Sequence, residues 1–169
     1  MSKLVTPFGF ESTTSDVLRG VDLSGKTALI TGANSGIGHE TARALASVGA
    51  AVVVAARRDR AGSDAAAQIA VSTGNPHVSN ILLDLADLES VARAAAGWSG
   101  PLHILVNNAG IMAVPELTRS AQGHELQFAT NYLGHFALTA GLRTALAAAG
   151  KARIVSLRAT NTGWRARPW

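Results

Sequence analysis

Short apolar segments alternate along this chain with stretches of helical periodicity, and this alternation constrains the fold more than any other feature. The apolar segments span residues 26–31, 50–56, 78–85, 102–110 and 152–157. Continuous apolar runs of this length are typical of strands that are covered on both faces of a parallel sheet. The pattern therefore predicts an α/β protein with a doubly wound parallel sheet of five strands, joined by right-handed crossovers.

The intervening segments have helical spacing and recognisable ends. Gly49 and Gly74 are typical of helix C-termini, and Asp87 is a good N-cap residue. Expected helices cover residues 35–49, 59–74, 87–98 and one long helix from Gln122 to Ala149, with a short helix at 15–20. We divide the chain into a lead-in (1–24), a dinucleotide-binding domain (25–157) and an aberrant tail (158–169).

The composition excludes several classes of protein. The chain has 169 residues, of which 47% are hydrophobic and 15% charged, enough for one ordered domain. It has no cysteine, so disulfides and thiolate metal sites are excluded, and we expect no metal. The net charge is +4, but the arginines are scattered, so we expect no nucleic-acid partner. No segment resembles a signal peptide or a membrane span, so we expect a cytoplasmic protein.

The sequence TGANSGIG, residues 31–38, joins the first expected strand to the first long helix. Gly32 allows a sharp turn, while Gly36 and Gly38 allow a pyrophosphate to approach the backbone and the helix to pack on the sheet. The helix N-terminus offers free N–H groups to an anion. The segment therefore predicts a phosphate site, with a glycine-rich turn that binds nothing as the alternative.

The residues after the second and third strands bear on which dinucleotide is bound. Arg57 and Arg58 follow the second strand, where an NAD site usually has an acidic residue. Two cations there favour the 2′-phosphate of NADP, although they could be ordinary loop charges, and Asp59 leaves NAD possible. Asp84 follows the third strand and could accept from the adenine amino group, or it could belong to a turn.

Three motifs together resemble the short-chain dehydrogenase/reductase family: TGANSGIG, NNAG (residues 107–110) and NYLGHF (residues 131–136). Their order and spacing match, and the helix around NYLGHF is similar to the branch of retinol dehydrogenases and the WW-domain oxidoreductase. The resemblance covers roughly residues 10–157. It implies the strand order 3-2-1-4-5, without the last two strands of the family, and oxidation of an alcohol or reduction of a ketone by hydride transfer.

The resemblance also implies roles for individual residues. Asn107 would join the central strands through its amide. Asn131 would be the catalytic asparagine, which distorts its helix and holds a water in a proton relay; a satisfied core asparagine is the alternative. The implied cofactor-binding residues are Gly32, Asn34, Ser35, Gly36, Ile37, Gly38, Arg57, Arg58, Asp84, Leu85, Asn108, Ala109 and Gly110.

The sequence departs from the family where the chemistry is expected. The family uses a tyrosine as acid/base, with a lysine four residues later that lowers the tyrosine pKa from about 10. The single tyrosine, Tyr132, is followed at that spacing by Phe136. Arg158 and Ala159 stand where the family has paired serines, and Ser156 matches a structural position. We therefore expect a chain that carries the family fold but lacks turnover.

The family pattern holds through Leu157, so we interpret residues 158–169 as out-of-frame or otherwise aberrant sequence on an incomplete chain. The last strand would then be a bare edge, which predicts marginal stability and aggregation. Two alternatives to a family oxidoreductase remain open. One is a non-catalytic NADP-binding fragment or pseudoenzyme. The other is an interaction fragment that pairs with a full-length partner or itself through the helix from Gln122 to Ala149.

Overall fold

The computed structural model describes residues 6–157, and the tail expected to be aberrant lies outside them. Its centre is a sheet of five parallel strands in the order β3-β2-β1-β4-β5, which confirms the predicted fold class. In register, Leu29 of β1 lies between Val53 of β2 and Leu105 of β4. The strands are β1 (Thr27–Thr31), β2 (Ala51–Ala56), β3 (Val78–Leu82), β4 (Ile104–Asn107) and β5 (Arg153–Ser156).

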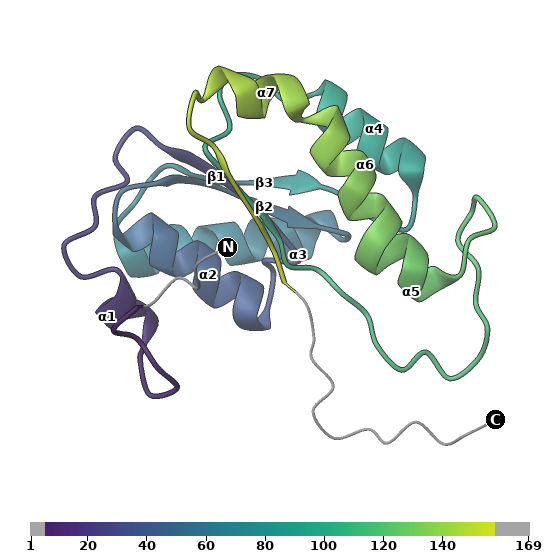
Figure 1. The fold of residues 1–169 in the computed structure, drawn as a ribbon, viewed down its shortest axis with the longest axis horizontal. Helices are drawn as coiled ribbons and strands as arrows, with labels where there is room; N and C mark the ends of the chain where they lie inside the picture. Colours follow the sequence, from purple (N-terminus) through teal and green to yellow (C-terminus); the bar gives the residue numbers. More distant parts are fainter. Residues whose placement is uncertain (1–5, 158–169) are drawn as a thin grey trace.

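Helices cover both faces of the sheet (Figure 1). Helices α2 (Gly36–Ser47) and α3 (Asp59–Thr73) pack on one face. The other face carries α4 (Leu88–Ala96), α6 (Gly134–Gly141) and α7 (Arg143–Ala148). The short elements are α1 (Thr14–Val17), α5 (Leu126–Phe128) and the π-helical segment η1 (Ala129–Leu133).

Each face of the sheet has its own apolar core, because alternate side chains of a strand point to opposite faces. Ala28 and Ile30 of β1 pack against α2 and α3. Leu29, between them in sequence, packs on the opposite side against Leu138 of α6. All three side chains are fully buried. This two-sided burial explains why the central strands are apolar without interruption.

Two predicted helix termini match the structure. The Asp87 side chain accepts a hydrogen bond from the backbone N–H of Glu89, so Asp87 is the N-cap of α4. Gly74 ends α3 in the left-handed conformation, with φ of 66°. At both positions the residue type supplies what the local backbone requires.

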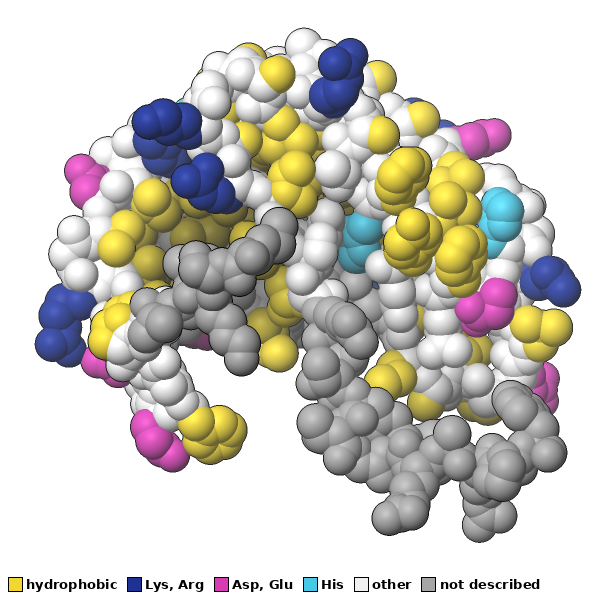
Figure 2. Space-filling view, viewed as in Figure 1, with side chains coloured by type: hydrophobic (Ala, Val, Ile, Leu, Met, Phe, Trp, Pro, Cys, Tyr) yellow, Lys and Arg dark blue, Asp and Glu magenta, His cyan; other side chains and the backbone are white. Residues whose placement is uncertain are grey.

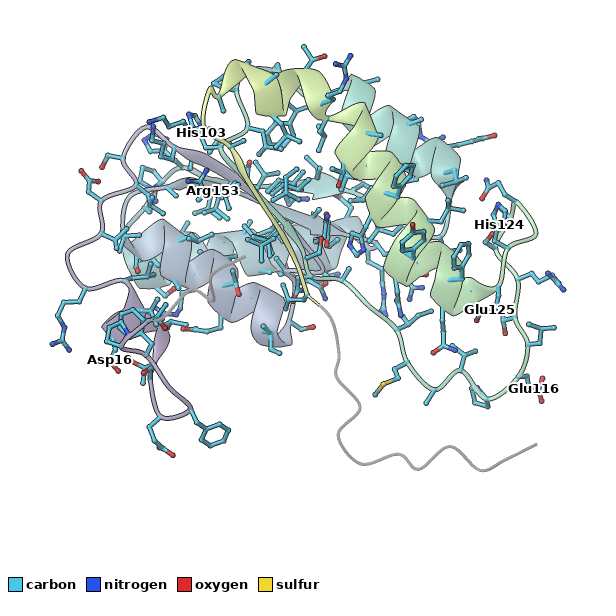
Figure 3. All side chains as sticks on the ribbon, viewed as in Figure 1. Asp16, His103, Glu116, His124, Glu125 and Arg153 are labelled. Carbon is cyan, nitrogen blue, oxygen red and sulfur yellow. The ribbon has the colours of Figure 1, made fainter. Side chains whose placement is uncertain are left out.

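The prediction of one long helix from Gln122 to Ala149 is wrong. The chain first forms a turn, in which Gly123 has φ of 83°, and the helix begins at Leu126. Glu125 caps it: its carboxylate accepts from the backbone N–H groups of Gln127 and Phe128. These bonds hold the pKa of Glu125 below its ordinary value. Figure 3 shows Glu125 where the loop enters the helix.

The same region is interrupted twice more. Residues Ala129–Leu133 form a π-helical turn, and Asn131 lies at its centre. A second interruption falls at Leu142, with φ of −87° and ψ of 6°, between α6 and α7. A π-turn inserts one residue into the hydrogen-bond pattern, so side chains beyond it are rotated relative to a regular helix. Apolar periodicity alone did not locate either break.

The lead-in forms α1, which is shorter than the predicted helix at 15–20 and begins at Thr14. Thr13 and Asp16 form a capping box. The Thr14 hydroxyl donates to Glu40 of α2 at 2.6 Å, and Arg43 forms an ion pair with the same carboxylate. The Thr14 bond anchors the lead-in to α2, while the ion pair within α2 holds the Glu40 carboxylate in place.

Strand β5 lies at one edge of the sheet and pairs, within residues 6–157, with β4 alone. Its residues Ile154 and Val155 are about half exposed, at 50% and 47%. This is the apolar edge that the sequence predicts. None of the helices in residues 6–157 combines the length and the apolar character that a membrane crossing requires.

Candidate cofactor site

A cavity of about 350 Å³ opens at the carboxyl ends of β1 to β4. In an open α/β sheet this is the edge where ligands bind, at the point where the strand order reverses. Its lining comes from the glycine-rich loop, the ends of β2 and β3, the loop after β4, and the segment formed by α5 and η1. The lining residues are Thr31, Gly32, Asn34, Ser35, Ile37, Gly38, Ala55, Arg57, Leu83, Asp84, Leu85, Asn108, Ala109, Gly110, Ile111, Leu126 and Thr130.

The three glycines of the loop have different structural roles. Gly32 has φ of 66°, and a Cβ on it would lie 2.9 Å from the Ala109 Cα. Gly38 packs against the carbonyl of Gly32 and the Asn108 side chain, so it permits close contact between helix and sheet. Gly36 has φ of 58°, but a Cβ there would meet nothing within 4 Å, and it does not line the cavity.

The N-terminus of α2 follows the glycine-rich loop and faces the cavity. Ser35 is the N-cap residue, and its side chain makes no capping hydrogen bond. The N–H groups of the first turn have no partner within a helix, and they carry partial positive charge. Ser35 and Ile37 both line the cavity. An anion in the cavity would therefore meet backbone donors that no side chain has capped.

Thr31 joins β1 to the loop after β4. Its hydroxyl oxygen accepts from the backbone N–H groups of Asn108 and Ala109, both at 2.9 Å. The Asn108 side chain donates back to the Thr31 carbonyl at 2.8 Å. Thr31 is fully buried, so these bonds are shielded from water. The two sides of the cavity are thereby held at a fixed separation.

The two consecutive asparagines make different contacts: Asn108 lines the cavity and bonds to β1, whereas the Asn107 amide joins β4 to β5 and α6. Asn108 reaches the neighbouring strand β1, as just described. Asn107 instead points to the other side and donates to Thr139 of α6 and Ser156 of β5, at 3.2 and 3.4 Å. Successive side chains of a strand alternate between faces, so only one of the pair can face β1. Among residues 6–157, the buried Asn107 Oδ1 atom finds no hydrogen-bond partner.

The residues after β2 separate into different environments. Arg57 lines the cavity, whereas Arg58 is the N-cap residue of α3 and does not. Asp59 does not line the cavity either; its carboxylate accepts from the Asn80 amide of β3 at 2.9 Å. Arg57 is therefore the charged side chain that the segment after β2 contributes to this site.

Asp84 lies on the cavity wall beside Leu85. Its Oδ1 atom accepts from the backbone N–H of Ala86 at 2.9 Å, and its own N–H donates to Ser90. These bonds are those of a turn residue, the alternative that the sequence leaves open, and they fix the Asp84 backbone against the cavity.

Asn131 does not line the cavity, but its side chain bonds to the backbone of Ile111, which does. Its side chain accepts from the Ile111 backbone N–H at 2.9 Å and donates to the Ile111 carbonyl at 2.8 Å. Asn131 is exposed, so the alternative of a core asparagine is wrong. Its place in a π-turn agrees with the helix distortion that the resemblance implies.

Tyr132 lies away from the cavity. Its ring stacks between Phe128 and Phe136, with centroid separations of 5.4 and 6.5 Å, and it is 61% exposed. The ionisable side chains of the cavity lining are Arg57 and Asp84. Within residues 6–157, no phenol paired with an ammonium group faces the cavity, and no cluster of three or more potential metal ligands is present.

The sequence analysis did not identify a buried histidine, His135, that bonds to Thr31 in the cavity lining. His135 contacts Thr31 and the Asn131 carbonyl, at 2.9 and 3.1 Å. Burial lowers its pKa, against a smaller opposing effect of the Asn131 bond. The sequence analysis also missed six residues of the cavity lining: Thr31, Ala55, Leu83, Ile111, Leu126 and Thr130. Most of them lie next to strand ends or to the glycine loop, and that position could have indicated them, because these segments meet at one edge of the sheet.

The sheet order, the glycine loop and the helix N-terminus define a Rossmann-type domain of the doubly wound class. The sequence profile of the short chain dehydrogenase family matches residues 26–166, continuing beyond Leu157, where we placed the end of the resemblance. The chain belongs to this family.

Known proteins agree with that assignment. The chain is 52% identical over 135 residues to a Streptomyces antibioticus protein described as "Probable oxidoreductase", covering 80% of this chain and 45% of that protein. Human retinol dehydrogenase 12 is 46% identical over 140 residues, with 81% and 44% covered. A metagenomic short-chain oxidoreductase solved in complex with NADP is 32% identical, with a TM-score of 0.66 and 78% and 61% covered. The chain spans less than half the length of the two curated relatives.

Proposed function

We propose that this chain binds NADP(H) in the cavity at the carboxyl edge of its sheet. The single observation that carries the proposal is that uncapped N–H groups at the α2 N-terminus and the Arg57 side chain line the same cavity. Backbone donors suit a pyrophosphate, and a guanidinium suits a 2′-phosphate. The Gly110 segment would lie beside the nicotinamide ribose. The family match and the NADP complex of a structural relative support this reading.

The preference for NADP over NAD rests on how the charges are arranged after β2. An acidic side chain that bonds the ribose hydroxyls would favour NAD. Asp59 is the acidic residue nearest that position in sequence, and its carboxylate is engaged by Asn80 on β3. Arg57, in contrast, lines the cavity. This arrangement presents a cation to the cofactor and holds the carboxylate toward the sheet.

Titration of the protein with NADPH and NADH, followed by nucleotide fluorescence, tests the proposal. Arg57→Ala should weaken NADPH binding about tenfold, since a hydrogen bond to a charged group contributes about 1.5–3 kcal/mol. NADH binding should change little. Arg60→Ala is the matched control, because Arg60 is an exposed arginine of α3 that lies near Asp64 and does not line the cavity. Absence of saturable NADPH binding by the unaltered chain would refute the proposal.

We further propose that this chain alone does not turn over a carbonyl substrate. NADPH supplies a hydride when bound, but reduction of a ketone to an alcohol also requires a proton donor at the carbonyl oxygen. Tyr132 is the only tyrosine in the sequence, and it lies outside the cavity in an exposed aromatic stack. The family activity, oxidation of an alcohol or reduction of a ketone, would therefore belong to a longer chain. Steady cofactor consumption by this purified chain with a lipophilic ketone would contradict this.

A second proposal concerns self-association. Phe128, Tyr132 and Phe136 form an exposed stacked row along α5, η1 and α6, with exposed fractions of 48%, 61% and 64%. Figure 2 shows hydrophobic side chains gathered on the surface over these helices. Contiguous exposed aromatics of this kind are typical of interaction surfaces. We propose that the row pairs with the same row of a second copy of this chain.

Sedimentation velocity tests this second proposal. Tyr132→Glu places a charge in the middle of the row and should shift the protein toward monomer. Phe10→Glu is the control, because Phe10 is fully exposed in the lead-in and belongs to no aromatic stack. If the unaltered chain is monomeric across the accessible concentration range, the proposal of self-association is wrong.

A further inference from the structure

His135 does not line the cavity, yet it is one of five buried polar side chains among residues 6–157. It lies on α6, one residue beyond the start of that helix, and is 7% exposed. Both ring nitrogens have a partner. The Nε2 atom lies 2.9 Å from the Thr31 hydroxyl, and Nδ1 lies 3.1 Å from the Asn131 carbonyl. The ring thus links β1 to the π-turn.

The partners assign the tautomer of this histidine. The Asn131 carbonyl can only accept, so Nδ1 must carry a proton. The Thr31 oxygen already accepts from two backbone N–H groups, those of Asn108 and Ala109. Its two lone pairs are therefore used, and its own proton has to be donated. The Val106 carbonyl is 3.4 Å away, so the better acceptor is an unprotonated Nε2 at 2.9 Å.

The direction of the Thr31 hydroxyl decides whether the loop after β4 is held. With its proton on Nε2, both lone pairs of Thr31 are available to the N–H groups of Asn108 and Ala109. If Nε2 carried a proton, it would donate to the Thr31 oxygen and would compete with the N–H group of Asn108 or of Ala109 for a lone pair. Asn108 and Ala109 line the cavity, directly after β4. The histidine therefore acts on the cavity wall through Thr31, without touching the cavity itself.

We propose that His135 is a positioning residue for the cofactor cavity: as a neutral Nδ1–H ring it orients the Thr31 hydroxyl, which fixes the Asn108 and Ala109 backbone beside the nicotinamide end of the bound dinucleotide. This inference rests on the proposed function for its ligand, but not for its geometry. Through the Asn131 carbonyl, the same ring also ties this wall to the π-turn whose asparagine grips Ile111. The loop after β4 is thus held at two points from one helical segment.

The first test is spectroscopic. Long-range ¹H–¹⁵N correlation spectra of the uniformly labelled full chain at pH 7.5 distinguish the two neutral tautomers and the imidazolium. The chain has five histidines, so the spectrum of His135→Leu assigns the signal. We expect His135 to be the Nδ1–H tautomer. An Nε2–H tautomer or a charged ring would overturn the proposal.

The second test measures the loop directly. Amide hydrogen exchange at Asn108 and Ala109 should become about tenfold faster in His135→Leu, which corresponds to about 1.4 kcal/mol for one lost hydrogen bond. Leu138→Ala is the matched control, because Leu138 is fully buried on the same helix and belongs to the apolar core on that face. The control should not accelerate these two amides selectively. Equal exchange in the unaltered chain and in His135→Leu would refute the positioning role.

A double-mutant cycle identifies the route of the effect. If His135 acts through the Thr31 hydroxyl, then Thr31→Val and His135→Leu should be strongly non-additive in the exchange of Asn108 and Ala109. Thr31→Ser retains the hydroxyl and should leave the effect of His135→Leu intact. Additive effects would show that the ring stabilises the loop by some other contact, and the proposal would fail.

NADPH titration separates this inference from the proposed function. If both are correct, His135→Leu weakens NADPH binding about three- to tenfold and Leu138→Ala does so less. If the unaltered chain does not bind NADPH, the proposed function fails, while the tautomer and the exchange rates still decide the role of His135. If NADPH binds but His135→Leu changes neither affinity nor exchange, the positioning role alone is wrong.

Discussion

Gly134 lies directly against the backbone of Leu85. A Cβ added to Gly134 would stand 2.9 Å from the Leu85 Cβ atom and closer still to the Leu85 carbonyl oxygen. Gly134 follows the π-turn and begins α6, whereas Leu85 belongs to the cavity wall after β3. The helix that carries Asn131 and His135 therefore approaches the cavity wall at a distance that only glycine permits.

Gly134→Ala should destabilise the protein even though alanine favours a helix. The gain in helix propensity is about 1 kcal/mol, while a methyl group forced against a backbone carbonyl costs about 1–3 kcal/mol or more. We expect a lower urea midpoint and weaker NADPH binding. Gly9→Ala is the control, because a methyl group there meets nothing within 4 Å and the φ of Gly9 is not left-handed. A Gly134→Ala variant as stable as the parent would contradict the close approach.

Asn131→Leu should release the Ile111 segment while the rest of the domain stays folded. It removes both bonds between the Asn131 side chain and the Ile111 backbone, which we expect to cost about 1–2 kcal/mol because the site is exposed to water. Hydrogen exchange at the Ile111 amide measures the release. Asn131→Asp keeps an acceptor for that amide, so its exchange should remain closer to the parent. Unchanged exchange in Asn131→Leu would show that other contacts hold the segment.

Acid should detach the lead-in from α2. Hydrogen bonding from Arg43, followed by that from Thr14, lowers the pKa of Glu40 to about 2 from 4.5. The unfolded state therefore binds more protons between these values. The contribution of the ionised Glu40 carboxylate to the free energy of unfolding is fully present above about pH 4.5 and is lost as the pH falls toward 2. Urea midpoints measured between pH 2 and pH 6 should decrease over this range, and the decrease should be smaller in Glu40→Gln. Glu89→Gln, on the exposed surface of α4, is the control.

His135 should add a second dependence on pH, in a higher range. Burial holds the pKa of His135 below the ordinary 6.5. Just below pH 6.5 the unfolded chain therefore binds a proton at His135, while the folded chain does not. The contribution of the neutral His135 ring to the free energy of unfolding is fully present above pH 6.5. It is lost as the pH falls from 6.5 through the lowered pKa of the folded state. Urea midpoints at pH 7.5, 6.5 and 5.5 measure the decrease. His135→Leu should lose this dependence, whereas His77→Gln should retain it because His77 is exposed.

A charge on the edge strand should reduce aggregation. Val155 is 47% exposed on β5, whose outer edge presents unpaired backbone groups within the described chain. Lysine at such an edge disfavours strand addition by another molecule. Val155→Lys should therefore scatter less light on heating at constant concentration. Val71→Lys adds the same charge at an exposed valine of α3, away from any edge. Equal improvement in both variants would point to net charge rather than to the edge.

The sequence by itself determined the sheet, its helices on both faces and the glycine loop, because strand runs, caps and left-handed glycines are encoded within a few neighbouring residues. Local patterns also placed Arg57 and Asn108 at strand ends, where parallel strands meet.

Only the tertiary structure decided which of these residues cooperate. It showed that Asn108 rather than Asn107 reaches β1, that a π-turn interrupts the predicted helix, and that His135 meets Thr31 across a separation of 104 residues. In the sequence, His135 is one polar residue in an apolar helical run. Its tautomer and its partner depend on how closely α6 packs on the sheet, which is set by the contacts of the whole domain and not by any local run of residues.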